Sequence, residues 1–206
     1  DLEKEDIKKK ALGKLFVISG PSGSGKTTLA RSVVGKMQEE YNIYKVITYT
    51  SRMPRAGEIS GIDYNFITKK DFGEKAEHGF FLEITIYDDE TYGSPHSIIS
   101  EAQEGKSFII VLDKAGAMNV KEIHQNIVLI WLSIPNIKIL KSRLKKRGTE
   151  SYEEIRSRLE IAEKELVCEL VDETFDYCII NENLEECTKE ICQIIRQEMS
   201  KCSSIE

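Results

Sequence analysis

The stretch Gly20-Pro-Ser-Gly-Ser-Gly-Lys-Thr27 decides the fold of this 206-residue chain. It matches the pattern G-x-x-x-x-G-K-[ST], in which glycines let the backbone curl so that successive N–H groups point at a phosphate. The run before it, Leu15–Ser19, is apolar and rich in branched and aromatic residues, which is typical of a buried strand. The run after it, from Thr27 to about Tyr41, carries apolar residues at helical spacing. A strand, a glycine loop and a helix in this order begin a parallel α/β sheet and predict a nucleoside triphosphate site.

Within this loop the lysine and the threonine have distinct expected tasks. We expect Lys26 to reach the β- and γ-phosphates and the Thr27 hydroxyl to bind Mg²⁺. A glycine-rich turn without a ligand is the alternative, and the strand before the loop and the helix after it disfavour that alternative. The residues predicted to bind the triphosphate are Gly20, Pro21, Ser22, Gly23, Ser24, Gly25, Lys26, Thr27 and Thr28.

Three later apolar runs predict further buried strands of the same sheet. They are Phe108–Leu112, Ile127–Leu132 and Tyr177–Ile180, and helical patterns lie between and after them. The stretch from Ile43 to about Ile86 differs, because its apolar runs are shorter and glycine and proline interrupt it. We therefore predict an α/β core with a small inserted subdomain.

Composition narrows the classes of partner. The chain has 29 Lys and Arg against 35 Asp and Glu, a formal net charge of −6, which disfavours binding to nucleic acid or to an anionic membrane surface. No apolar run approaches the ~18 residues of a membrane span. The five cysteines are odd in number and none has C-x-x-C spacing. This favours free thiols in a reducing compartment, so a cytoplasmic location is expected.

A second cluster of basic residues follows the first helix. Arg52 and Arg55 lie three residues apart beside a Pro-Gly turn, with Tyr64 nearby. Two forked guanidiniums and a phenol can hold a second phosphate. On charge alone, an exposed loop with basic side chains is the more common explanation.

The full pattern changes this interpretation. Residues 52–66 read Arg-x-Pro-Arg-x-Gly-Glu-x-x-Gly-x-Asp-Tyr-x-Phe, and together with the glycine loop they make the chain resemble guanylate kinase. The stretches around Glu83, Tyr92, Arg147 and Asn181 are similar too, and the resemblance runs from about Leu15 to the C-terminal helix.

The resemblance implies transfer of the γ-phosphoryl group of ATP to GMP, with Mg²⁺, giving ADP and GDP. It implies a single domain over residues 1–206, with a P-loop NTPase parallel-sheet core that has helices on both faces. The core would comprise residues 13–44, 91–136 and 163–206. A GMP-binding subdomain would comprise about 45–90, and a helical lid about 137–162.

The resemblance also implies roles for single residues. Glu83 would accept the guanine edge, whose N1–H and N2–H₂ are adjacent donors that one carboxylate can satisfy. Asn181 and Arg143 would lie at the ATP, and Asp113 would serve Mg²⁺ through water, or the guanine amino group, or both. The catalytic residues implied are Lys26, Arg52, Arg147 and Arg158. The GMP-binding residues implied are Thr48, Arg52, Arg55, Tyr64, Glu83, Tyr92, Gly93, Ser94 and Asp113.

One position departs from the family pattern. The family commonly has two acids at the end of the strand that here reads Ile110-Val-Leu-Asp113, and Val111 replaces the first acid. Two other functions stay open. One is a guanylate-kinase-like scaffold module that binds proteins without activity. The other is a P-loop kinase for another nucleoside monophosphate. The sequence predicts a monomer but does not decide against a dimer, nor between GMP and dGMP.

Overall fold

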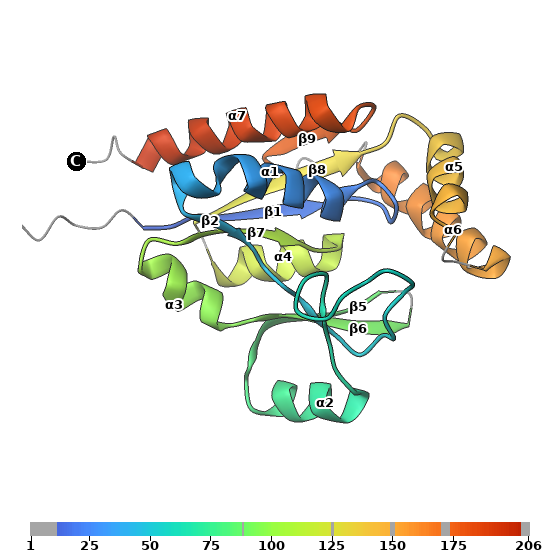
Figure 1. The fold of residues 1–206 in the computed structure, drawn as a ribbon, viewed down its shortest axis with the longest axis horizontal. Coiled ribbons are helices and arrows are strands. Elements are labelled where there is room, and N and C mark those ends of the chain that lie inside the picture. Colours follow the sequence, from blue (N-terminus) through green and yellow to red (C-terminus); the bar gives the residue numbers. More distant parts are fainter. Residues whose placement is uncertain (1–11, 88, 125, 149–150, 170–173, 203–206) are drawn as a thin grey trace, which may run out of the picture.

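The computed structural model describes residues 12–87, 89–124, 126–148, 151–169 and 174–202. Within these ranges the elements form a five-stranded core sheet, a four-stranded smaller sheet and seven helices (Figure 1).

The core sheet is entirely parallel, as the sequence predicts. Leu15 of the central strand lies beside Phe108 on one side and Ile127 on the other. All five side chains of that strand are buried, because a parallel sheet with helices on both faces exposes neither side. In spatial order the strands are β2 (Ile43–Lys45), β7 (Ser107–Val111), β1 (Leu15–Ser19), β8 (Ile127–Ser133) and β9 (Tyr177–Ile180).

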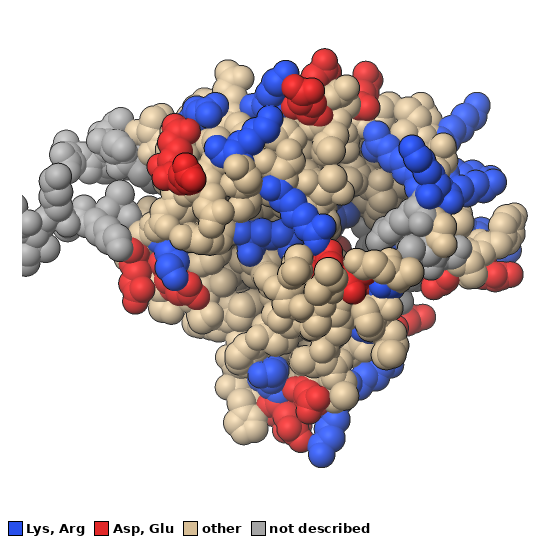
Figure 2. Space-filling view, in the orientation of Figure 1, with Lys and Arg blue, Asp and Glu red and all other residues tan. Residues whose placement is uncertain are grey.

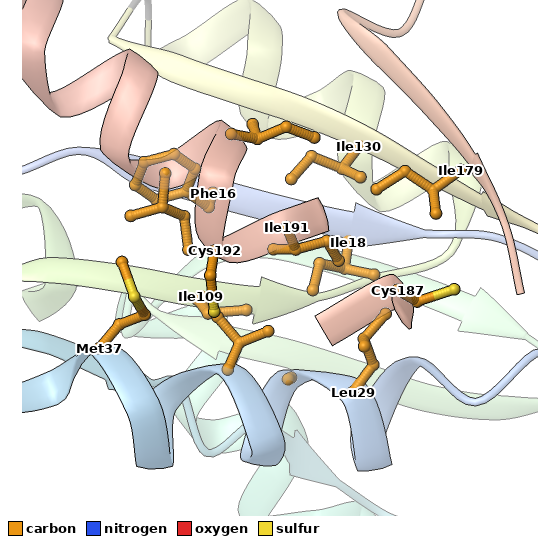
Figure 3. Close-up of a cluster of buried hydrophobic side chains, with 14 of the residues drawn as sticks. Phe16, Ile18, Leu29, Met37, Ile109, Ile130, Ile179, Cys187, Ile191 and Cys192 are labelled. Carbon is orange, nitrogen blue, oxygen red and sulfur yellow. The ribbon is translucent and has the colours of Figure 1, made fainter. Parts of the chain in front are cut away.

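Helices α1 (Lys26–Tyr41) and α7 (Leu184–Cys202) cover one face of this sheet (Figure 1). Phe16 and Ile18, alternate residues of β1, point into this layer. Figure 3 shows them packed against Leu29 and other side chains of the two helices. The helical spacing of apolar residues in α1 therefore encodes its contact with the sheet.

The opposite face is covered by α3 (Ser97–Gln103) and α4 (Lys114–Ile123). Leu15 and Val17, the other alternate residues of β1, point into this second layer. The predicted fold class, an α/β core with helices on both faces, is confirmed.

The smaller sheet lies below the core in the view of Figure 1, and one helix is inserted between its strands. Its strands, in spatial order, are β4 (Asn65–Phe66), β3 (Tyr49–Thr50), β6 (Glu90–Pro95) and β5 (Phe81–Tyr87), and its helix is α2 (Lys69–Glu77). The expected return to the core at residue 91 is too early, because β6 pairs with β3 and β5 in the smaller sheet.

Two helices project from the carboxyl end of β8, where the sequence predicts a lid. These are α5 (Ile137–Arg147) and α6 (Tyr152–Glu169). Their apolar faces share a separate small cluster that includes Leu140, Leu144 and Ile155. The expected lid boundary at residue 162 falls inside α6, which is one continuous helix.

The structure bears on two features noted in the sequence, the lack of a membrane-spanning run and the cysteines. Among the helices of the described ranges, none has the length and hydrophobicity needed to cross a bilayer. No disulfide joins Cys178, Cys187 and Cys192, the cysteines whose side chains the structure describes.

Replacing Ile130 by alanine tests the core. Ile130 is fully buried in β8, so Ile130→Ala should cost about 2–5 kcal/mol of unfolding free energy through lost burial and the remaining cavity. The matched control is Ile86→Ala on β5, where the side chain is 72% exposed and the cost should stay under about 1 kcal/mol. Urea unfolding measures both, and equal losses would contradict the layer assignment.

Candidate active site

A cavity of about 410 Å³ opens where the carboxyl ends of the core strands face the smaller sheet. This is the edge at which ligands bind in open parallel sheets. Lys and Arg side chains lie on both sides of the hollowed part of this face (Figure 2). The predicted residues that line the cavity are Gly20, Ser22, Gly23, Gly25, Lys26, Thr27, Thr28, Thr48, Arg55, Tyr64, Tyr92, Asp113, Arg143 and Arg158. The predicted residues outside its lining are Pro21, Ser24, Arg52, Glu83, Gly93, Ser94 and Asn181.

The glycine loop joins β1 to α1 in a conformation that side chains would prevent. Gly20 has φ 144°, and a Cβ there would lie 2.2 Å from the carbonyl oxygen of Leu132. Helix α1 begins after Gly25 without a side-chain cap, so the N–H groups of its first turn remain available to an anion at the cavity. Lys26 Nζ donates to the loop's own carbonyls at Gly20 and Pro21, at 2.6 and 2.9 Å, which holds the ammonium at the mouth of the loop.

Helix α5 packs directly on the glycine loop. A Cβ on Gly23 would lie 2.7 Å from Leu140 and 2.9 Å from Leu144, so the absence of a side chain lets the helix approach. Two of the predicted arginines lie beside this contact. Arg158 donates to the Ser22 hydroxyl at 2.5 Å and Arg143 lines the cavity.

The third predicted arginine of the lid, Arg147, is the last residue of α5, and its side chain lies outside the described residues.

Asn181 supports the loop from behind. It follows β9, is 4% exposed, and its side-chain N–H₂ donates to the carbonyl of Ser24 at 2.6 Å. The backbone carbonyl of Asn181 accepts a hydrogen bond from the Arg143 guanidinium at 2.8 Å. The structure thus assigns Asn181 a contact with the loop backbone, whereas the resemblance implies a place near the ATP base.

The predicted acceptor cluster lies across the cavity, on the segment between β3 and β4 and on β6. Arg55, Tyr64 and Tyr92 line the cavity, and Arg52 lies behind them with its guanidinium paired to Glu58. The sequence pattern suggests that both arginines offer forked guanidiniums to a phosphate. In this structure the fork of Arg52 faces a carboxylate.

Glu83 is a buried carboxyl with an open hydrogen-bonding oxygen. Oε1 accepts from the backbone N–H of Ser94 at 3.0 Å, while Oε2 is buried and has no hydrogen-bond partner in the described chain. Glu83 and Thr85 are buried on one face of β5 while Ile84 between them is exposed, so strand alternation turns Glu83 inward. Burial raises the pKa of Glu83 to about 7 against the opposing effect of Ser94, and the nearby Asp113 raises it further.

Asp113 lies close to Glu83, with Gly116 between them. A Cβ on Gly116 would lie 3.1 Å from Asp113 Oδ1 and 3.3 Å from Glu83 Oε2. Asp113 Oδ1 also accepts the N–H of Gly116 at 2.7 Å, which caps α4. Burial raises the pKa of Asp113, while this hydrogen bond and the nearby Lys26 lower it.

The cavity includes residues that the sequence interpretation did not assign. Thr85 lies two residues after Glu83 and is buried on the same face of β5, so strand alternation could have identified it. Glu58 stands inside the 52–66 pattern, but its contact with Arg52 depends on the turn between them. Arg31 and Asp63 both line the cavity and form an ion pair, and nothing in the sequence predicts that contact.

Comparison with known proteins identifies the family. Residues 12–198 match the sequence profile described as guanylate kinase. A guanylate kinase of Thermotoga maritima is 38% identical over 190 residues, which is 92% of this chain and 89% of that protein. One of Helicobacter pylori is 40% identical over 86% of this chain and 83% of its own length.

The chain belongs to the guanylate kinase family.

A solved structure of this family has the same fold. The crystal structure of guanylate kinase from Anaplasma phagocytophilum superposes with a TM-score of 0.74 at 28% identity. The match covers 92% of this chain and 88% of that one. The overall fold of this chain is therefore one that it shares with a solved guanylate kinase.

The donor set at the glycine loop suits Mg²⁺. Thr27 and Asp113 both line the cavity and offer oxygen atoms. Among the described residues there is no cluster of three or more His, Cys, Asp or Glu that could enclose a metal by itself. Mg²⁺ typically takes one or two protein oxygens and fills its remaining positions with water and phosphate, so two donors beside a phosphate loop fit it.

Replacing Glu83 by glutamine tests the burial of this carboxyl. The folded-state pKa, about 7, exceeds the ordinary 4.5, so wild type loses stability as pH rises from about 4.5 to about 7. Glu83→Gln removes the buried charge and keeps the acceptor for Ser94. At pH 8 it should be more stable than wild type by about 1–3 kcal/mol. Denaturant unfolding at pH 5 and pH 8 measures this, and a difference that does not grow with pH would contradict it.

Proposed function

We propose that this chain transfers the γ-phosphoryl group of ATP to GMP, giving ADP and GDP. The observation that carries the proposal is a single cavity lined both by the glycine loop with Lys26 and by Arg55, Tyr64 and Tyr92 of the inserted subdomain. One set of phosphate-binding residues comes from the core and the other from the inserted subdomain, and both face the same cavity. This arrangement suits a reaction between two nucleotides.

In this proposal Glu83 selects guanine over other bases. Its Oε2 is buried without a partner, and guanine offers two adjacent N–H donors that a carboxylate can accept together. Adenine lacks that pair of donors, so an adenine base would leave the buried oxygen unsatisfied. A site built around such hydrogen bonds can reject the wrong base by ~10⁴-fold or more. Thr48, Gly93, Ser94 and Asp113 complete the base pocket.

The phosphate of GMP would lie against Arg55, Tyr64 and Tyr92, with Arg52 behind them. The triphosphate of ATP would lie in the loop 20–28, where the N-terminal end of α1 favours its negative charge. In place of its present hydrogen bonds to loop carbonyls, Lys26 would bind the β- and γ-phosphates.

Transfer requires positive charge at the moving phosphoryl group. Arg143 and Arg158, carried by α5 and α6, face the loop and would stabilise this charge together with Arg147. When bound, Mg²⁺ would supply charge at the β- and γ-phosphates, and Thr27 and Asp113 are the residues that would hold it. With no covalent step on the protein, the residues act by in-line positioning and charge stabilisation.

Neither alternative function is favoured. A scaffold module typically has a degraded phosphate loop, whereas Lys26 and Thr27 are both in place here. A kinase for AMP or a pyrimidine nucleotide would leave Glu83 without a suitable pair of donors.

The test of this function is ADP formation from ATP and Mg²⁺ with GMP, AMP, UMP or dTMP as the acceptor. We expect turnover with GMP and little with the others. Lys26→Ala should lower kcat by about 10³-fold or more, because it removes the charge that meets the β- and γ-phosphates. Circular dichroism would check that this variant folds. Full activity of Lys26→Ala, or preference for another acceptor, would contradict the proposal.

Glu83→Gln tests the base contact separately. Glutamine presents one acceptor and one N–H₂ group, so one donor of guanine would meet another donor. The KM for GMP should rise about 100-fold or more while the KM for ATP changes less than about two-fold. Steady-state kinetics with each nucleotide varied in turn measures the difference, and unchanged GMP kinetics would show that Glu83 does not hold the base.

A further inference from the structure

Glu58 occupies the centre of the acceptor cluster, although the pattern of basic residues gave it no role. Both terminal nitrogens of the Arg52 guanidinium donate to it, Nη1 to Oε2 at 2.9 Å and Nη2 to Oε1 at 3.0 Å. This is the two-bond, fork-on-fork geometry in which an arginine and a carboxylate bind most strongly. Side-chain exposures of 8% for Arg52 and 14% for Glu58 place the pair largely out of water.

The same carboxylate also fixes the second arginine. Glu58 Oε2 accepts the backbone N–H of Arg55 at 2.7 Å, and Oε1 lies 3.9 Å from Arg55 Nη1. The chain reverses between them through Gly57, whose φ of 84° is a conformation that favours glycine. The turn is closed by the N–H of Glu58 donating to the carbonyl of Arg55 at 3.0 Å.

The two tyrosines of the cluster are attached to the other side of the pair. Arg52 Nε donates to the Tyr92 hydroxyl at 3.3 Å. The Arg52 guanidinium lies 5.3 Å from the ring centre of Tyr64 and 5.5 Å from that of Phe66, within cation–π range. Arg55, Tyr64 and Tyr92, which face the cavity, therefore all contact the Arg52–Glu58 pair.

The ionisation of Glu58 suits this arrangement. Burial would raise its pKa, yet the hydrogen bonds from Arg52 and from the N–H of Arg55 hold the pKa below its ordinary value. Glu58 thus stays charged at neutral pH, and the buried charge of Arg52 stays compensated.

We propose that Glu58 is the positioning residue of the acceptor-phosphate site. It holds Arg52 and the turn at Arg55, and through Arg52 it sets the two tyrosines, so that these groups meet the phosphate already in place. The bonds of Arg52 to Tyr92, Met53 and Glu58 leave one N–H of Nη2 without a partner in the described chain. This inference rests on the proposed function, since it concerns how GMP is bound.

Geometry favours positioning over competition. Glu58 lines the cavity together with Arg55 and both tyrosines, and these three present their own groups to the space beside its carboxylate, while Arg52 lies behind the lining. A carboxylate that only blocked the site would need to leave before phosphate binds. Its loss would then improve binding, whereas the loss of a positioning residue weakens it.

The test compares Glu58→Gln with a matched control, Glu74→Gln. Glutamine has the same size but turns an N–H₂ group toward a donor of Arg52, so the pair is lost. Glu74 is a carboxylate of the same subdomain, on α2, in an exposed pair with Lys70 at 3.7 Å. We expect the KM for GMP to rise about 10- to 100-fold in Glu58→Gln, with the KM for ATP changed less than two-fold. Glu74→Gln should match wild type in every parameter.

A second variant keeps the test decisive if Glu58→Gln does not fold. Glu58→Asp retains the charge with a shorter reach, and its KM for GMP should fall between wild type and Glu58→Gln, or rise at least several-fold if it is the only variant that folds.

Each remaining outcome has a distinct meaning. A lower KM for GMP would mean that Glu58 competes with phosphate, and an unchanged KM would mean that the pair is dispensable. Equal losses for GMP and ATP would indicate a general structural role. All three overturn the inference while wild type remains active with GMP. A wild type that does not use GMP would instead overturn the proposed function, and this inference with it.

Discussion

Backbone crowding at the glycine loop is the constraint on which the rest of the site depends. A Cβ would meet the carbonyl of Leu132 at Gly20 and the side chain of Asn181 at Gly25, at 2.2 and 2.7 Å. At Gly23 it would meet α5. Three other elements therefore converge on the loop only because it has no side chains at these points. This convergence places the N-terminus of α1, the lid arginines and the carboxyl ends of the strands around one cavity.

Two carboxyls of the inserted subdomain, the partly buried Glu58 and the buried Glu83, differ in a way that matches different tasks. Glu58 is satisfied by Arg52 and Arg55, and its pKa lies below the ordinary value. Glu83 has one oxygen without a partner in the described chain, and burial raises its pKa to about 7. The hydrogen bonds of Glu58 are made within the protein, as in a structural ion pair. The arrangement of Glu83 is a cost to the folded protein that a ligand with two N–H donors would offset. The chain carries a net charge of −6, yet cations gather at this cavity, because local placement decides the field at a site.

Predictions from the sequence succeeded where local pattern and tertiary role coincide. β1 and β9 have the predicted bounds. β1 is buried along its whole length, as expected of an apolar run before a glycine loop. β9 is the edge strand of the sheet and exposes Cys178 and Ile180, although the sequence predicts a buried strand there. The end of the inserted subdomain was placed too early. Residues 90–95 are mixed in polarity, and their membership in the smaller sheet depends on hydrogen bonds to β3 and β5. Likewise, no local signal divides α6 at residue 162.

By itself, the sequence determined the α/β class, the glycine loop and the identity of most groups around the cavity. Those features depend on neighbouring residues or on a motif of fixed spacing, so the chain carries them locally. Only the tertiary structure decided which partner each group has. It paired Arg52 with Glu58 of the cavity lining, left Glu83 Oε2 without a partner in the described chain, and set Asn181 against the carbonyl of Ser24. Such pairings join residues brought together by turns and by sheet register, and the free energy of a buried charge depends on those contacts rather than on its position in the chain.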